Sequence, residues 1–352
     1  MTKLEQILEK FHFVGLKEKF SKEKIFEYFS SKKITNSKNP NEQIFTLSNK
    51  IETSMKTILV QKVLTTPFVL EYALLSNEHH STNSLVKRNV QKMIGKKLTN
   101  EFKKKEKEFN LKFKEIFQLN SHLDFGRSAL SNLIGGIGFF SGSSIHEYED
   151  NEPILTSPNN VLFCTTPSRS FFPRGFLWDE GFHQLLIQKW DKEIYQDIFT
   201  HWLNLMDSNG WIAREQILGE EARSKVPPEF QKQKSTNANP PTLFLTLLNL
   251  LENLKLKKVQ INSNLQENNL TNNMTSNFQQ NIENNENKKD EEFLKKIFPK
   301  LKLHYEWFFK TQSGSIKDSF RWRGRTKGHN FASGLDDYPR GKKKIIYKFI
   351  FF

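Results

Sequence analysis

The sequence predicts a mainly α protein in which paired helices form an α/α toroid. Four segments carry apolar side chains at helical spacing, namely 182–190, 194–206, 242–254 and 293–309. The loops between them are rich in Trp, Arg, Asp and Pro, as expected where loops line one mouth of such a toroid. The chain has 352 residues, 36% of them hydrophobic, which is enough for one large domain with its own core.

Residues 1–84 are predicted to be a remnant of a β domain and a linker. Residues 56–75 contain β-branched and aromatic runs interrupted by a Thr-Pro pair, a pattern typical of two strands. Two strands are too few for an independent sheet. Residues 85–120 then predict an amphipathic linker helix, with apolar positions at Phe102, Phe109, Phe113 and Ile116.

Two further segments have unusual compositions. Residues 129–140 are rich in glycine and small side chains, but they lack the Lys-Ser/Thr pair of a phosphate loop, so close helix packing is the better interpretation. Residues 260–292 are dominated by Asn, Gln, Glu and Lys with few large apolar groups. Such a composition predicts a disordered insertion between two helices.

The charge and the cysteine count limit the classes of partner. The net charge of +14 comes mainly from residues 96–114 and 342–348, which lack the aromatic and glycine pattern of an RNA-binding surface. We therefore expect a solvated helix face and no nucleic-acid partner. Cys164 is the single cysteine, so neither an internal disulfide nor a cysteine-based zinc site is possible. No metal or cofactor is expected, and no apolar run approaches the length of a membrane span.

The first segment with candidate chemistry is 167–183, where aromatic and charged side chains alternate. A sugar site needs aromatic rings that pack on the C–H face of a pyranose, and charged groups that bind its hydroxyls. Trp178 beside Asp179 offers this pairing, with Phe176 and Glu180 next to it. The alternative is a core tryptophan with a surface ion pair.

The second and third segments add carboxylates and arginines. In residues 209–223, Trp211, Arg214 and Glu215 lie between turn signals, although the charged residues could also belong to a solvated helix. In residues 321–340, Arg321 precedes a Gly-Leu-Asp turn that contains Asp336. Asp336 suits a positioned general acid, because the adjacent carboxylate Asp337 would help it to retain its proton. The alternative is an Asp-capped helix start.

Taken together and in order, residues 167–183, 210–223 and 333–340 closely resemble glycoside hydrolase family 63, the mannosyl-oligosaccharide glucosidase family. The resemblance implies a partial (α/α)6 barrel over residues 121–340, preceded by a β-sandwich. It also implies inverting removal of the terminal α-1,2-linked glucose from the N-linked Glc3Man9GlcNAc2 glycan in the lumen of the endoplasmic reticulum. Asp336 then corresponds to the general acid. The residues expected to bind substrate are Phe176, Trp178, Asp179, Glu180, Trp211, Arg214, Glu215, Arg321 and Asp337.

The chain also departs from the family pattern. The general base of the family is a Glu beyond the equivalent of Arg340, and residues 341–352 no longer resemble the family. The membrane anchor expected in the full-length family is likewise not recognisable in the sequence. We therefore expect a truncated chain without its general base, which should be inactive. Two alternatives stay open: a glycan-binding remnant without catalysis, and a trehalase-like hydrolase of the same clan.

Overall fold

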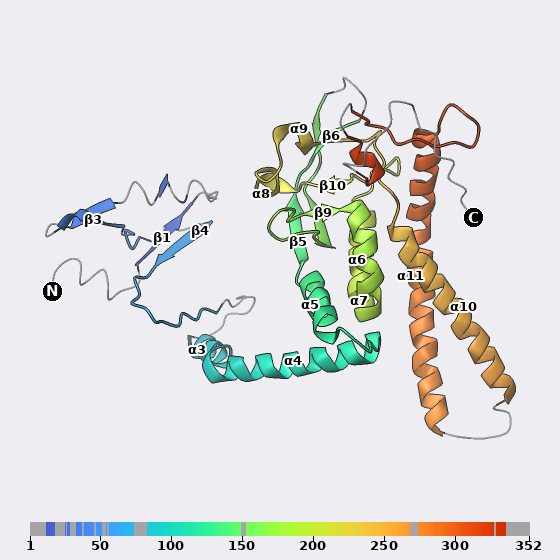
Figure 1. Cartoon of the computed structure of the whole chain (residues 1–352), viewed down its shortest axis with the longest axis horizontal. Helices are drawn as coiled ribbons and strands as arrows, with labels where there is room; N and C mark the ends of the chain where they lie inside the picture. Colours follow the sequence, from blue (N-terminus) through green and yellow to red (C-terminus); the bar gives the residue numbers. More distant parts are fainter. Residues whose placement is uncertain are drawn as a thin grey trace. The chain divides into compact units, whose positions relative to one another are not determined.

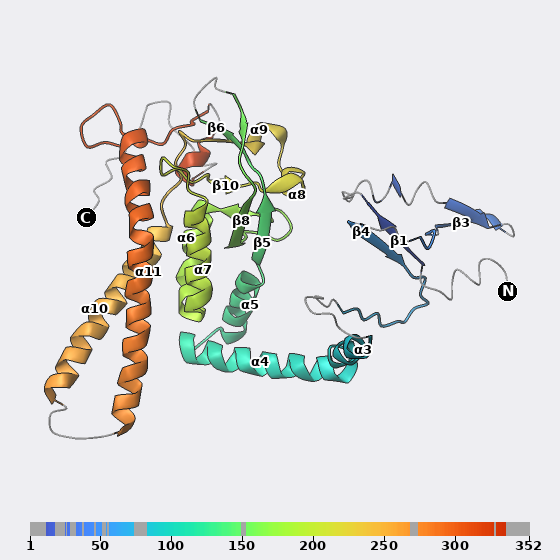
Figure 2. The ribbon, with the colours of Figure 1, turned by 180° about the vertical axis from the view of Figure 1, so that it is seen from behind.

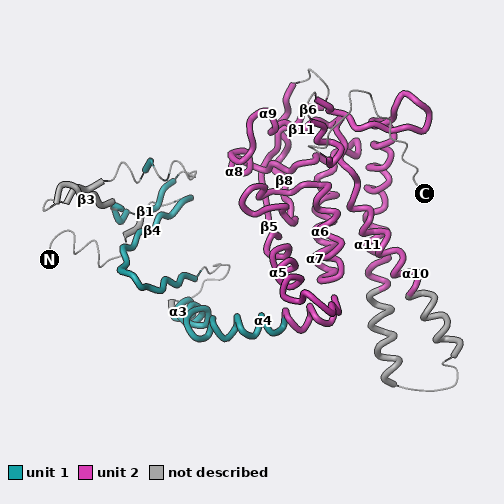
Figure 3. Tube along the Cα trace, in the orientation of Figure 1, with its two compact units in different colours: residues 1–108 teal, residues 109–352 magenta. Residues whose placement is uncertain are grey.

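The computed structural model describes most of the chain as two units, residues 1–108 and 109–352 (Figure 3). The described residues are 12–17, 25, 27–28, 33–36, 39–45, 47–50, 54, 56–73, 83–148, 153–267, 274–326 and 329–335; of these, the side chains at 12–13, 33–45, 83 and 257–286 are not described. The described residues are mainly helical, with short strands between the helices, which confirms the predicted mainly α class (Figure 1).

The described part of the first unit contains two separate two-stranded antiparallel sheets. Strand β1 (His12–Leu16) pairs with β4 (Thr57–Gln61), and β2 (Lys33–Asn36) pairs with β3 (Asn39–Phe45). Of the two strands expected within residues 56–75, the described residues 56–73 form one, β4. Residues 62–73 contain no strand. Proline lacks a backbone N–H, so Pro67 cannot donate a ladder hydrogen bond. Whether these sheets belong to a β-sandwich stays a prediction.

The expected linker helix is present but broken into α3 (Asn83–Lys92) and α4 (Gly95–Phe117). The break covers residues 93–94, and α4 begins at Gly95, whose φ of 62° lies in the left-handed region that glycine adopts without strain. Helix α4 crosses the boundary between the two units, and Phe113 is its buried residue. The lysine-rich face of α4 is exposed, as predicted for a solvated helix face.

In the second unit, the glycine-rich segment 129–140 contains a helix end, a turn and a strand. Helix α5 (Leu123–Ile134) ends at a Gly-Gly turn, and strand β5 (Ile137–Gly142) pairs antiparallel with β8 (Asn160–Thr165). The predicted helix packing is therefore wrong beyond residue 134. Gly135 and Gly136 form the turn. The backbone N–H and C=O groups of the Ile-Gly-Phe-Phe run that follows form hydrogen bonds with β8, so this run does not pack as a helix.

Two more small sheets complete the strand content of the described second unit. Strand β6 (Ile145–Glu147) lies between the parallel strand β11 (Lys232–Lys234) and the antiparallel strand β7 (Leu155–Thr156). Strand β9 (Gly175–Phe176) pairs with β10 (Glu215–Gln216), which brings the first two candidate motifs together. Short helices α8 (Gly219–Arg223) and α9 (Pro228–Gln231) follow β10 in the chain.

All four helices that the periodicity predicts are present. They are α6 (Leu177–Trp190), α7 (Lys192–Asn204), α10 (Leu243–Glu267) and α11 (Met274–Gln312). Figures 1 and 2 show α6 and α7 as neighbours, with α10 and α11 as a second pair beside them. Asp191 separates α6 from α7 and caps α7, because its carboxylate accepts a hydrogen bond of 3.1 Å from the Ile194 N–H.

The core of the second unit lies where α6, α7, α10, α11 and strand β8 meet. Burial of large apolar side chains is the main stabilising contribution there, at roughly 25 cal/mol for each Å² removed from water. The largest apolar side chains that are fully buried are Trp202, Tyr195, Phe199, Leu162, Ile187 and Ile198. Among the described residues, no helix combines the length and apolar character that crossing a membrane requires.

The segment expected to be a disordered insertion, 260–292, is helical where it is described. Helix α10 extends to Glu267, and α11 begins at Met274. Asn, Gln, Glu and Lys cannot build a core, but they can lengthen a helix that apolar packing has already nucleated, because extension costs far less than nucleation. Composition alone therefore did not predict the local structure of this segment.

Candidate active site

The site begins at the junction between β9 and α6, in the first candidate motif. Gly175 must be glycine, because a Cβ there would lie 2.6 Å from Leu162 Cδ2 and 3.0 Å from a ring carbon of Trp202. Helix α6 starts directly after the strand, and the Leu177 N–H donates a 2.9 Å hydrogen bond to the carbonyl oxygen of Arg214. This link fixes Trp178 and Asp179 in the first turn of α6, beside the second motif.

A buried carboxylate between two arginines lies at this junction. Glu215 is ion-paired with Arg174, and its other carboxylate oxygen lies 3.2 Å from Nη2 of Arg214. The Glu215 and Arg174 side chains are 4% and 6% exposed, whereas the Arg214 side chain is 19% exposed. Nη1 of Arg174 has no hydrogen-bond acceptor among the described residues. The cluster carries a net positive charge and a buried guanidinium nitrogen without an acceptor among the described residues.

Aromatic rings lie against both guanidinium groups and form a stack. The Arg174 guanidinium lies 5.7 Å from the ring of Phe172 and 5.1 Å from that of Phe176. The Arg214 guanidinium lies 5.7 Å from Phe176 and 5.1 Å from Phe331. We call these five residues the aromatic–arginine stack. Ring faces attract the cations but use none of their N–H donors, so the edges of both guanidinium groups can still bind oxygen atoms.

The third motif contacts the first motif through Gly334, which packs against Trp178. A Cβ on Gly334 would lie 2.9 Å from the indole ring of Trp178 and 3.1 Å from Cγ of Pro240, so the backbone of residue 334 lies directly on the indole. The Trp178 backbone is held on both sides, because its N–H donates to Asn239 Oδ1 at 2.8 Å and its carbonyl accepts from Thr242 Oγ1 at 2.6 Å. Trp178 is half-buried, which leaves part of its ring accessible.

Glu180, predicted to bind substrate, lies instead in the protein core. Its side chain is fully buried, and its carboxylate accepts hydrogen bonds from the Thr165 N–H at 3.0 Å, Gln184 Nε2 at 2.6 Å and Trp202 Nε1 at 3.0 Å. Burial raises the pKa of Glu180 to about 7, although these donors act in the opposite direction. The carboxylate joins β8, α6 and α7, which favours a structural role.

Trp211 is also more deeply placed than a sugar platform would be. It is 2% exposed, its Nε1 donates a 3.1 Å hydrogen bond to the Asn237 carbonyl, and the His146 ring packs against it edge-on at 5.0 Å. It belongs to a small buried cluster with Trp307. Arg214 is a member of the stack and Glu215 is paired with both of its arginines. Trp211 instead packs in the loop that precedes them.

The remaining predicted residues separate into two groups. Asp179 is half-buried in the first turn of α6, and Arg321 is exposed, with its backbone N–H bonded to the Gln312 carbonyl at 2.8 Å. Asp336 and Asp337 lie outside the described residues, as does the expected tail 341–352. The structure therefore brings Phe176, Trp178, Asp179, Arg214 and Glu215 to one place, while nothing here assigns Arg321 to it.

Sequence reasoning missed Arg174 and Phe331 as members of the stack, whereas Phe172 was among the rings expected to line the pocket. Arg174 lies within the first motif, but its pairing with Glu215 depends on the contact between β9 and β10, which periodicity cannot reveal. The sequence feature that could have identified Arg174 is its position directly before Gly175, with Phe172 two residues before it and Phe176 two residues after it. Among the described residues, no cluster of His, Cys, Asp or Glu has an arrangement suited to a metal ion.

Comparison with known proteins decides the family. A family model described as the glycosyl hydrolase family 63 C-terminal domain matches residues 93–346. The chain belongs to this family. It is 38% identical over 315 residues to mannosyl-oligosaccharide glucosidase GCS1 of Arabidopsis thaliana, covering 84% of this chain and 34% of that protein.

Two other relatives are similar over comparable lengths. The chain is 35% identical over 323 residues to a probable mannosyl-oligosaccharide glucosidase of Schizosaccharomyces pombe, covering 80% of this chain and 39% of that protein. It is 39% identical over 248 residues to the mannosyl-oligosaccharide glucosidase of Saccharomyces cerevisiae, covering 62% and 30%. The family 63 chain thus spans about a third of the length of these relatives.

Proposed function

We propose that this family 63 chain provides the substrate-binding part of an inverting α-glucosidase that acts on mannosyl-oligosaccharides. The observation that carries the proposal is the carboxylate Glu215 held between Arg174 and Arg214, with aromatic rings against both arginines and Trp178 nearby. A pyranose offers C–H faces for rings and hydroxyl groups for charged donors and acceptors. The names of the relatives supply the substrate class.

We assign the general acid to Asp336, as the family resemblance implies. Asp336 follows Gly334 by two positions in the sequence, and Gly334 lies on the indole of Trp178. Inverting hydrolysis needs a protonated carboxylic acid at the leaving oxygen and a second carboxylate that activates water, with the two carboxyl groups roughly 6.5–9.5 Å apart. The bond cleaved is the terminal α-1,2 linkage to glucose.

The proposed setting is an (α/α)6 barrel in the lumen of the endoplasmic reticulum. Two neighbouring helix pairs, α6 with α7 and α10 with α11, support the barrel, because such a ring is built from successive pairs. A crystal structure in which these pairs do not lie on one ring would contradict it.

Localisation of a tagged chain outside the secretory compartments would contradict the proposed location.

Two measurements on the whole chain test the function. Calorimetric titration with 1-deoxynojirimycin, a glucose mimic, should show binding that Glu215→Gln abolishes, because the amide can no longer pair with both arginines. Glucose release is measured from kojibiose, an α-1,2-linked glucose disaccharide, with trehalose as the competing substrate. Asp336→Asn should keep binding and should remove any release that the unaltered chain shows. Binding without release in the unaltered chain would agree with the expected lack of a general base, and release from trehalose alone would contradict the proposed linkage.

A further inference from the structure

The aromatic–arginine stack combines residues from three parts of the chain, and Phe331 is its member from the third motif. Phe331 opens the 3-10 turn η2 (Phe331–Ser333), and its ring lies 5.1 Å from the Arg214 guanidinium. The same guanidinium lies 5.7 Å from the ring of Phe176. Arg214 thus contacts two rings, one from β9 and one from the segment that precedes Gly334.

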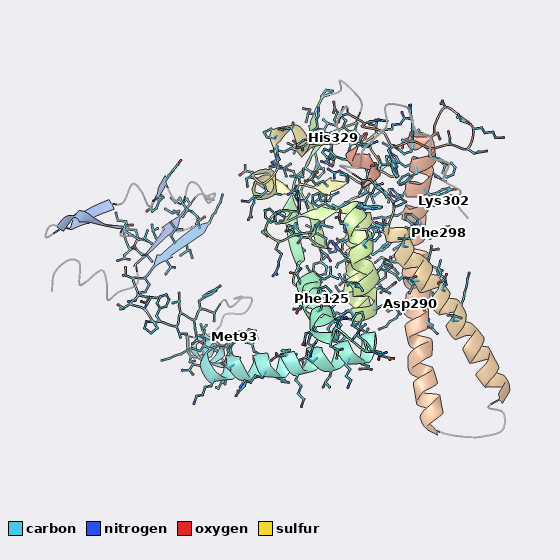
Figure 4. The ribbon with its side chains drawn as sticks, viewed as in Figure 1. Met93, Phe125, Asp290, Phe298, Lys302 and His329 are labelled. Atoms are coloured by element: carbon cyan, nitrogen blue, oxygen red, sulfur yellow. The ribbon has the colours of Figure 1, made fainter. Side chains whose placement is uncertain are left out.

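The ring of Phe331 is itself supported from behind. The His329 imidazole is stacked on it, with centroids 3.9 Å apart and planes inclined by 15°, and the ring of Phe230 meets it edge-on at 5.5 Å. Figure 4 shows His329 at the end of the second unit where α9 and β6 lie. Ala332 and Ser333 are buried, and Ser333 Oγ donates to the Asn330 carbonyl at 2.8 Å. These contacts hold the Phe331 ring in place.

Arg214 depends on such support more than Arg174 does. Arg174 is 6% exposed and is directly ion-paired with Glu215, whereas Arg214 is 19% exposed and its Nη2 lies 3.2 Å from the Glu215 carboxylate. An arginine side chain has several rotatable bonds, and holding it in one arrangement costs side-chain entropy. A second ring face lowers the number of arrangements that the guanidinium can adopt.

We propose that Phe331 is a positioning residue that holds Arg214, and through it one oxygen of Glu215, in the arrangement that binds the sugar. The inference rests on the proposed function for its sugar-binding part. Phe331 itself need not touch the substrate, because it acts through Arg214. Stacking leaves the in-plane N–H groups of Arg214 available to Glu215 and to a sugar hydroxyl.

The test compares Phe331→Leu, which keeps an apolar side chain but loses the ring face, with Phe331→Tyr, which keeps the ring. Phe309→Leu is the matched control, since Phe309 packs edge-on against Phe320 at 5.0 Å in the same unit. For 1-deoxynojirimycin, Phe331→Leu should raise the Kd about fivefold, while the other two variants stay within about twofold. Equal losses in Phe331→Leu and Phe309→Leu would overturn the proposal.

A second measurement needs no sugar ligand. The rate at which phenylglyoxal modifies Arg214 is followed by peptide mass spectrometry, with Arg174 in the same spectra as an internal reference. Phe331→Leu should raise the rate at Arg214 about fivefold and leave Arg174 unchanged. An unchanged rate at Arg214 would overturn the positioning role. If the unaltered chain does not bind 1-deoxynojirimycin but the rate at Arg214 rises as expected, the proposed function fails and the holding of Arg214 by Phe331 stands.

Discussion

Gly334 lies directly against the indole ring of Trp178, so closely that a Cβ on residue 334 would come within 2.9 Å of the ring carbons. Its φ of 72° is in the left-handed region, which costs a non-glycine residue roughly 1–2 kcal/mol. Both constraints require glycine here. They join a residue of the third motif to the first turn of α6, over a long separation in sequence.

Replacing Gly334 by alanine should therefore disturb Trp178 as well as the turn. We expect Gly334→Ala to change the tryptophan fluorescence spectrum and to lower the free energy of unfolding by about 2 kcal/mol. The control is Gly95→Ala, because Gly95 has a φ of 62° but open space around its Cβ position. A spectrum altered equally by both substitutions would show that the contact with Trp178 is not responsible.

Glu180 should make the second unit less stable as the pH rises. Its pKa of about 7 in the folded protein exceeds the value of 4.5 for an unperturbed glutamate, so the folded state binds the proton more tightly. The contribution is fully favourable below about pH 4.5 and is lost through pH 7, by about 3 kcal/mol in total. Urea unfolding between pH 4.5 and 8 should show this slope in the unaltered chain and not in Glu180→Gln.

The control for the pH measurement is Glu252→Gln, which alters an exposed glutamate of α10. That variant should follow the profile of the unaltered chain. A Glu180→Gln profile with the same slope would mean that another group produces the dependence.

The ion pair between Lys192 and Asp290 should respond asymmetrically to substitution. The Asp290 side chain on α11 is 4% exposed and also accepts from Gln196 Nε2 at 3.2 Å, whereas Lys192 on α7 is 34% exposed (Figure 4). Lys192→Met leaves a buried charge without its partner and should cost about 3 kcal/mol. Asp290→Asn frees a lysine that can reach water and should cost about 1 kcal/mol. Thermal unfolding distinguishes the two, and equal losses would contradict the asymmetry.

The two tryptophans of the first two motifs should separate into a ligand-binding and a packing residue. Trp178→Leu should abolish binding of 1-deoxynojirimycin with little loss of stability, since Trp178 is only half-buried. Trp211→Phe removes a buried 3.1 Å hydrogen bond and should lower the free energy of unfolding by about 2 kcal/mol while binding persists. Calorimetry and urea unfolding test both variants. If a well-folded Trp211→Phe variant lost binding of 1-deoxynojirimycin, Trp211 would be a substrate-binding residue and not a packing residue.

Much of the helical framework could be predicted, because each main helix buries an apolar stripe that periodicity reveals. Most strands could not, although β4 forms within residues 56–75 where strands were predicted. Strands β9 and β10 have two residues each, and their pairing depends on contacts far apart in sequence. Segment 129–140 was misread because glycines that close a turn resemble glycines that pack helices.

The sequence predicted which segments form the candidate site. It did not predict which of their residues face the site and which belong to the core. Asp179 and Glu180 are adjacent acids that we assigned the same role. The spacing of Glu180, Gln184 and Ile187 on α6 marks them as one buried helix face, and this signal could have separated Glu180 from the site. Phe331 could not be grouped with residues 172 and 174 of the first motif, because only the tertiary structure brings these segments together.

The start of α6 also has a consequence for the comparison of related sequences. Each residue along an α-helix is turned by about 100° from the one before it. A single-residue insertion between Gly175 and Asp179 would therefore move Asp179 into the place of the core carboxylate and Glu180 into the place of Gly181, where a side chain would collide with Thr242. The spacing across this junction must stay fixed while side chains vary, so gaps in a family alignment belong in the loops on either side of it.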